Sequence, residues 1–184
     1  ESINYTNFRY TEKIENSYHV ENINDSHLIN LINSINSKKY IILSGANFIK
    51  NDQLKNIKNS PGFQGIYNIH FGNCLKYRGL DSNIWASYHE DFKNIGVSLH
   101  NVSSELDKGD LVIYSMITNF NSIEDLKFKE IESAKNVLAK FRSIIDSNSI
   151  IPNIKNKGLG RYYGPMPACL KKIALKKIFK KNLL

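Results

Sequence analysis

Apolar residues recur every three or four positions in residues 26–37, near the start of the chain. This spacing places them on one face of a helix, and Asp25 and Ser26 precede them as candidate caps. The apolar positions are Leu28, Ile29, Leu31, Ile32 and Ile35. A short apolar run at 40–43 follows and ends near the turn-former Gly45, so the pattern predicts a buried strand after the helix.

Helical and strand patterns go on alternating as far as residue 145. The last of them is a long periodic segment that opens with the cap Ser122, which predicts a helix over 122–145. The other predicted elements are strands at 65–70, 95–102 and 110–117 and helices at 51–59 and 82–92. Strands that alternate with helices indicate an α/β fold, so we expect a Rossmann-like, mostly parallel sheet flanked by helices. Residues 1–17 are polar and rich in asparagine, and we expect the usual opening elements of such a sheet to be missing.

The last part of the chain, 151–184, differs in character from the rest. Glycines and prolines gather at 158–167 and predict a loop, and the residues after them have helical spacing. One side of this helix carries lysines, and the other side is apolar. The apolar residues are Ala174, Leu175, Ile178 and Phe179. We therefore divide the chain into a core at 1–150 and a C-terminal loop with a basic amphipathic helix at 151–184.

Two interpretations of this helix stay open. Its apolar side would pack against the body of the protein, or against a partner subunit in a homodimer, with the lysines in solvent. Alternatively, the lysines would hold the helix weakly on an anionic membrane surface.

The charge of the chain is concentrated in the same helix. The 184 residues carry a formal net charge of +8, and six of the 25 lysines and arginines lie in 168–184, which holds no acid. The nearly neutral body argues against a nucleic-acid partner. No apolar run approaches the roughly 20 residues that span a bilayer, and the two cysteines, Cys74 and Cys169, fit a reducing compartment. These features predict a cytoplasmic location.

Two side chains with catalytic potential end the predicted strand 65–70. Asn68 and His70 are two positions apart, so they point to the same side of a strand. An amide can stabilise an oxyanion while an imidazole moves a proton, which suits acyl transfer. Asp107 follows the strand 95–102 through a short loop, and a carboxylate beside an imidazole raises the pKa of the histidine and fixes its tautomer. Each residue also fits a structural role, and Asp107 fits a hairpin turn in solvent.

Three segments in this order resemble the family of formyltransferases that use 10-formyltetrahydrofolate. They are NIHFGNCLKYRG at 68–79, IWASYHEDFKNIGVSLH at 84–100 and LDKGDLV at 106–112. The family pattern is an Asn-x-His strand end, a loop that closes in Arg-Gly, a Gly-Val-Thr-x-His segment and a Leu-Asp-x-Gly-Asp segment. Gly72 departs from it where Ser is usual, and so do Leu75 where Pro is usual and Ser103 where Asp is frequent. In the same loop we expect Cys74 to pack as a small side chain rather than act as a nucleophile.

The resemblance implies a formyl transfer without a metal, in which 10-formyltetrahydrofolate is the donor. Asn68 would donate a hydrogen bond to the developing oxyanion, and a protonated His70 would add charge stabilisation. Asp107 would orient His70 and help receive the proton of the amine. The pterin would lie between two segments. These are Gly45, Ala46, Asn47, Phe48 and Ile49 on one side and Val102, Ser104 and Leu106 on the other.

The same resemblance implies a primary amine as acceptor. The 67 residues after Ile117 are too few for a long helix and the β-barrel domain of methionyl-tRNA formyltransferase, and Gly109-Asp110 stands where glycinamide ribonucleotide formyltransferase has Gly-Pro. The helix at 84–92 and the C-terminal helix look more like formyltransferases of surface-polysaccharide pathways, so we favour a nucleotide-linked amino sugar. A methionyl-tRNA formyltransferase-like enzyme and an impaired or truncated homologue are the alternatives.

Overall fold

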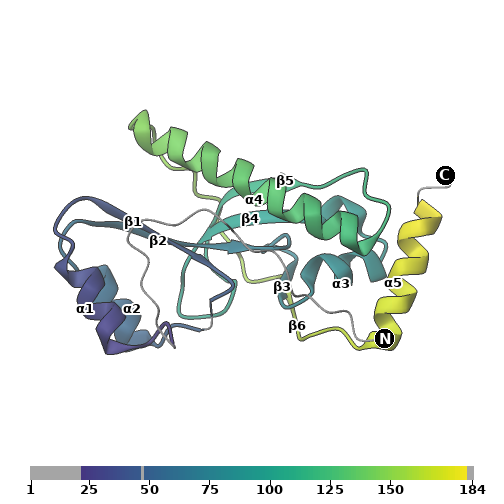
Figure 1. Ribbon diagram of the computed structural model, residues 1–184, viewed down its shortest axis with the longest axis horizontal. Coiled ribbons are helices and arrows are strands. Elements are labelled where there is room, and N and C mark those ends of the chain that lie inside the picture. The colour runs from purple at the N-terminus through teal and green to yellow at the C-terminus, as the bar shows by residue number, and fades with distance from the viewer. Residues whose placement is uncertain (1–21, 47, 182–184) are drawn as a thin grey trace, which may run out of the picture.

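A computed structural model describes residues 22–46 and 48–181 (Figure 1). It contains a four-stranded sheet in the order β1-β2-β4-β5 and a two-stranded sheet of β3 and β6. The strands are β1 (Lys39–Ser44), β2 (Phe63–His70), β3 (Tyr77–Gly79), β4 (Gly96–Asn101), β5 (Leu111–Met116) and β6 (Arg161–Tyr163). The helices are α1 (Ser26–Ser34), α2 (Asn51–Lys58), α3 (Ser82–Tyr88), α4 (Ile123–Asp146) and α5 (Ala168–Lys181), with a short 3-10 helix, η1 (Phe92–Asn94).

The predicted α/β class is confirmed, and two predicted helix caps are formed. The Asp25 carboxylate accepts a hydrogen bond from the backbone N–H of His27 at the start of α1. At the start of α4, the Ser122 hydroxyl accepts one from the backbone N–H of Asp125. Both caps satisfy backbone donors that a helix leaves without a partner at its N-terminus.

The four-stranded sheet is mixed rather than mostly parallel. β1 pairs with β2 in parallel, whereas β2 pairs with β4 and β4 with β5 in antiparallel orientation. The connection between β4 and β5, residues 102–110, is shorter than the dozen or more residues that a parallel crossover needs. These two strands therefore form a hairpin, a feature that the alternation of helix and strand patterns does not reveal.

Helices cover both faces of the sheet (Figure 1). α1 and α2 pack beside β1 and β2 around a small apolar cluster that includes Ile29 and Ile57. α4 packs against β4 and β5, and the main core between them includes Leu99, Phe120 and Leu126. The strand predicted at 40–43 exists, but it is less buried than predicted. Among the described residues β1 has a neighbour on one side only, and Ile42 is 36% exposed.

The C-terminal helix α5 packs against α3 (Figure 1). Ala174 and Ile178 are buried as predicted, but Phe179 is 57% exposed because it is one residue, and so about 100°, away from Ile178 around the helix. Two of the lysines are not free in solvent. Lys171 pairs with Asp81 at 2.9 Å and Lys177 with Glu90 at 3.0 Å. The docking interpretation is thus confirmed for the described part of the helix. The membrane contact and the homodimer stay predictions, and none of the helices described has the length and apolar character to cross a membrane.

Candidate active site

The structure brings Asn68, His70 and Asp107 together at the end of β2. Asn68 and His70 are alternate residues of this strand, and Asp107 lies in the loop between β4 and β5. The Asn68 Nδ2 atom donates to Asp107 Oδ1 at 3.3 Å, and His70 Nδ1 is 3.5 Å from Asp107 Oδ2. One carboxylate therefore contacts both of the other side chains through different oxygens.

The backbone around Asp107 is held in an unusual conformation. Asp107 has a φ of +51°, in the left-handed region that few residues other than glycine adopt. The backbone N–H of Gly79, at the end of β3, donates to Asp107 Oδ2 at 2.9 Å. The Arg-Gly end of the loop after β2 thus anchors the same carboxylate oxygen that His70 approaches.

His100 belongs to the same cluster, although the sequence interpretation gave it no role. It lies opposite Asn68 in the antiparallel pairing of β2 and β4, and it is buried. Its Nε2 atom is 3.3 Å from Asp107 Oδ1 and 3.3 Å from Asn68 Nδ2. The signal was present, because His100 ends the second of the three segments that resemble the formyltransferases.

The partners of the two histidines assign one nitrogen of each ring as a donor. His70 Nε2 is 2.8 Å from the carbonyl oxygen of Tyr77, and His100 Nδ1 is 2.8 Å from that of Asn101. Because a carbonyl oxygen only accepts, both nitrogens carry a proton. The remaining nitrogen of each ring faces Asp107, so each histidine donates to the carboxylate when it is protonated a second time. A neutral His100 instead accepts a hydrogen bond from Asn68. The protonation of each ring therefore changes which hydrogen bonds Asp107 and Asn68 can make.

Burial and charge act in opposite directions on these groups. Burial lowers the pKa of His70 below its ordinary value, although the charge of Asp107 and the Tyr77 carbonyl oppose this effect. Burial alone would raise the pKa of Asp107, but the hydrogen bond to His100, the charge of His70 and the N–H of Gly79 outweigh it and lower this pKa. At neutral pH the cluster thus favours an ionised Asp107 and a neutral His70, in contrast to the protonated His70 that the resemblance implies.

A small cavity with mainly apolar walls lies on one side of the cluster. Five of the eight predicted pterin-pocket residues line it, namely Ala46, Phe48, Ile49, Val102 and Leu106. Gly45 lines the neighbouring larger cavity, Ser104 lines neither, and Asn47 lies outside the described residues. Ser103 and Glu105, within the segment 102–106, also line the small cavity, as do Leu43 and His100, which were not predicted.

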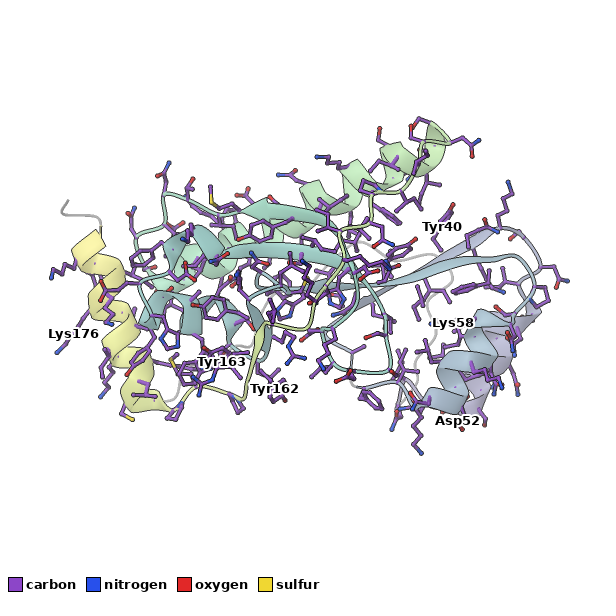
Figure 2. All side chains as sticks on the ribbon, turned by 180° about the vertical axis from the view of Figure 1, so that it is seen from behind. Tyr40, Asp52, Lys58, Tyr162, Tyr163 and Lys176 are labelled. Carbon is purple, nitrogen blue, oxygen red and sulfur yellow. The ribbon has the colours of Figure 1, made fainter. Side chains whose placement is uncertain are left out.

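A second cavity, of about 370 Å³, opens on the same cluster and is more polar. Lys127 from α4 and Tyr162 from β6 line it, together with Asn68, His70 and Asp107. The Lys127 ammonium pairs at 2.8 Å with Glu130, whose buried carboxylate also accepts a hydrogen bond from Asn83. Tyr162 points away from α3, whereas its neighbour Tyr163 turns toward that helix and stacks on Trp85 (Figure 2). An ammonium and an exposed aromatic ring thus face the space next to the cluster.

One departure from the family pattern, Gly72, has a local explanation. A Cβ atom at Gly72 would approach His70 Nε2 to 2.7 Å and the Cβ atom of Ser82 to 2.6 Å, so glycine fits this packing without a shift of its neighbours. Cys74 is fully buried, and burial raises the pKa of its thiol to about 12. The thiol stays neutral near pH 7, which agrees with a packing role. Within the described residues no group of three or more His, Cys, Asp and Glu side chains is arranged to hold a metal ion.

Comparison with known proteins gives matches only among solved structures. No family model and no curated protein sequence matches the chain. A sugar N-formyltransferase from Shewanella sp FDAARGOS_354 superimposes with a TM-score of 0.61 and 13% identity, over 83% of this chain and 64% of that one. A 4-N formyltransferase from Francisella tularensis gives a TM-score of 0.60 and 18% identity, over 81% of this chain and 63% of that one.

A third match comes from a structure with bound ligands. The formyltransferase PseJ from Anoxybacillus kamchatkensis, in complex with UDP-4,6-dideoxy-4-formamido-L-AltNAc and tetrahydrofolate, gives a TM-score of 0.56 and 18% identity. The match covers 68% of this chain and 64% of that one. The chain therefore has the formyltransferase fold, and it spans less than two thirds of the length of each of these three structures.

Proposed function

We propose that this protein is an N-formyltransferase of the cytoplasm that moves a formyl group from 10-formyltetrahydrofolate to the amine of a nucleotide-linked amino sugar. The observation that carries the proposal is the contact of Asn68, His70 and Asp107 between two cavities, on the fold of the sugar N-formyltransferases. A two-substrate transfer needs this arrangement, because donor and acceptor must reach the same catalytic groups from different sides.

The small cavity, of about 40 Å³, shares Ala46, Phe48 and Leu106 with the larger one, and its apolar walls suit one edge of the pterin of the donor. Phe48 and Leu106 expose apolar surface beside it, and Asn68 and Asp107 supply polar groups at its inner end. A flat heterocycle with polar edges fits walls of this kind. Tetrahydrofolate is bound in the PseJ structure, which supports a folate as the ligand of this fold.

The donor supplies the formyl group, and the cluster handles the charge and the proton. As the amine attacks and negative charge develops on the formyl oxygen, one N–H of the Asn68 amide exchanges its contact with His100 for a hydrogen bond to this oxygen. The proton that the amine loses passes by way of the Asp107 carboxylate to Nδ1 of a neutral His70, and Asp107 then stabilises the resulting imidazolium. The new bond joins the amine nitrogen to the formyl carbon, the bond from that carbon to the folate nitrogen breaks, and the proton passes to the folate nitrogen. His100 Nε2 lies 3.3 Å from the other carboxylate oxygen, so this ring donates to Asp107 as well when it is protonated.

The larger cavity suits an acceptor with a negative charge and a flat ring. The Lys127 ammonium provides a partner for a phosphate, and the exposed ring of Tyr162 provides a stacking surface for a base or a sugar. A nucleotide-linked amino sugar carries both features and the primary amine. The UDP-linked sugar bound in the PseJ structure supports this class of acceptor.

A homologue that binds ligands without turnover is the second candidate. It is favoured by the contacts within the cluster, in which the Asn68 amide and both ring nitrogens of His70 already have partners in the protein.

Donor binding and transfer are measured separately to test the two candidates. Calorimetry with 5-formyltetrahydrofolate, a stable relative of the donor, measures binding by the protein from its complete reading frame. An assay with UDP- and dTDP-linked amino sugars measures transfer. Binding with transfer is the expected result, binding without transfer would favour the second candidate, and a protein that does neither would contradict both.

A further inference from the structure

Residues 154–158, which follow α4, run along the loop that carries Asp107. Ile154 and Leu111 exchange both of their backbone hydrogen bonds, at 2.9 Å and 2.8 Å. Lys155 Nζ pairs with Asp110 Oδ2 at 2.7 Å, and the backbone N–H of Asn156 donates to Asp110 Oδ1 at 3.0 Å. Residues 154–158, which lie outside the predicted core at 1–150, thus contact the loop that carries Asp107.

The side chain of Asn156 contacts two loops of the site at once. Its Nδ2 atom donates to the carbonyl oxygens of Gly109 at 3.3 Å and of Asp107 and Cys74 at 3.5 Å each. Its Oδ1 atom accepts a hydrogen bond from the backbone N–H of Gly158 at 3.0 Å, within its own turn. One end of the side chain therefore stabilises the local turn, and the other end joins the loop after β2 to the loop after β4.

Asn156 contacts the backbone of Asp107 and Gly109, whose conformation depends on contacts with the surrounding residues. Asp107 has a positive φ, which costs free energy in a residue with a Cβ atom and persists only when the surroundings fix it. At Gly109 the backbone approaches Asn101 so closely that an added Cβ atom would overlap its carbonyl oxygen. Both residues accept hydrogen bonds from the same Asn156 amide. The carboxylate of Asp107 reaches His70 and His100 only while this backbone stays in place.

We propose that Asn156 is a positioning residue, whose amide fixes the backbone of Asp107 and Gly109 and so holds the carboxylate against the two histidines. Its effect on turnover rests on the proposed function, whereas its effect on the geometry of the cluster does not.

Two substitutions separate the amide contacts from the local turn. Asn156→Ala removes both ends of the side chain. Asn156→Ser keeps an oxygen that can accept from Gly158, but it is too short to reach the three carbonyl oxygens. Asn136→Ala is the matched control, because Asn136 is exposed on α4, far in sequence from both loops.

We expect both Asn156 variants to lower kcat about tenfold or more, because small displacements of catalytic groups are costly, while the KM for the donor changes less than threefold. We also expect the acid limb of the kcat profile, which follows the protonation of His70, to move to lower pH. A displaced Asp107 no longer raises the pKa of His70, so the ring stays neutral to a lower pH. Asn136→Ala should match the wild type in all three measurements. A purely structural role would reduce the amount of folded protein without moving the acid limb.

Histidine NMR makes the test independent of activity. Asp107 raises the pKa of His70, so its displacement should lower this pKa further in both Asn156 variants, as read from the Cε1–H chemical shifts. If the wild type shows no transfer activity but the His70 titration still shifts in both variants, the result would support the positioning role and contradict the proposed function. Unchanged titration in both variants, wild-type behaviour of Asn156→Ser, or a shifted titration with unchanged kcat would each overturn the positioning role.

Discussion

Strands β1 and β4 belong to one sheet but differ in burial and in the number of neighbouring strands. β4 lies between β2 and β5 under α4, and its residues Val97 and Leu99 are fully buried. β1 has one neighbouring strand among the described residues, and half-buried and exposed side chains line most of its length. The candidate catalytic groups come from the buried region around β2 and β4, whereas the end of β1 contributes Leu43 to a wall of the donor cavity. This difference places the candidate catalytic groups where backbone and side chains are most constrained, and part of the proposed donor pocket where they are less so.

The largest effect should come from the most constrained region. His70→Ala removes the group that accepts the proton, and loss of a general acid–base lowers kcat by roughly 10²–10⁴-fold. A steady-state assay and thermal unfolding of the same samples measure the change in turnover and in stability. His27→Ala, on the exposed face of α1, is the matched control. Unchanged turnover in His70→Ala at an unchanged melting temperature would contradict the mechanism.

Truncation of one side chain in each strand tests the comparison itself. Leu99→Ala in β4 creates a cavity in the main core and should lower the free energy of unfolding by about 2–5 kcal/mol. Ile42→Ala in β1 removes a side chain that is 36% exposed, so the loss should be about 1 kcal/mol. Urea unfolding of both variants gives the two values. Equal losses would mean that β1 is covered in the folded protein by a surface outside the described residues.

The features that the sequence predicts correctly are those that depend on residues close together along the chain. The Asp25 and Ser122 caps and the shared side of Asn68 and His70 depend on neighbours a few residues away, and local spacing shows them. The antiparallel direction of β4 depends on how distant strands pair, which hydrophobic periodicity does not encode. The same is true of the contact of Asn156 with Asp107, since these two residues are 49 positions apart.

The role of His100 was missed for a different reason. The position of His100 at the end of a buried strand is visible in the sequence. Whether His100 belongs to the candidate site depends on Asp107, which approaches it from a loop. Burial at the strand end fits packing as well as catalysis, and only the distance to the carboxylate, 3.3 Å, separates the two.

A substitution in the small cavity, the proposed donor site, should change the affinity for the donor more than the rate of transfer. Phe48 lines both cavities. Phe48→Ala removes apolar surface that a bound donor would contact equally before and during transfer, so we expect the KM for the donor to rise about tenfold with little change in kcat. Calorimetry with 5-formyltetrahydrofolate should give a similar loss of affinity. A fall in kcat without a change in KM would place Phe48 in the chemical step and remove the distinction between the two regions.

The buried cluster should also make stability depend on pH. The pKa of His70 is lower in the folded protein than in the unfolded chain, so the unfolded chain binds more protons and stability falls as pH drops below about 6.5. Asp107 has a lowered pKa as well, and its contribution is present above about pH 4 and is lost as pH falls through the folded pKa. Urea unfolding between pH 5 and 7.5 measures the first effect. His70→Gln should flatten the curve in this range, and an equally steep curve in that variant would show that another group titrates.

The smallest effect concerns the charges of α5, on the surface of the molecule. Lys177 donates to the carbonyl oxygen of Tyr88 at 2.6 Å and pairs with Glu90, whereas Ile178 is fully buried beside it. Exposed ion pairs contribute about 0–1 kcal/mol, so Lys177→Ala should change the free energy of unfolding by no more than this amount, and 1 M salt should reduce the difference. Ile178→Ala should cost about 2–5 kcal/mol at either salt concentration, because burial of apolar surface holds the helix. If the lysine variant lost more than the isoleucine variant, charge rather than burial would dock α5 on α3.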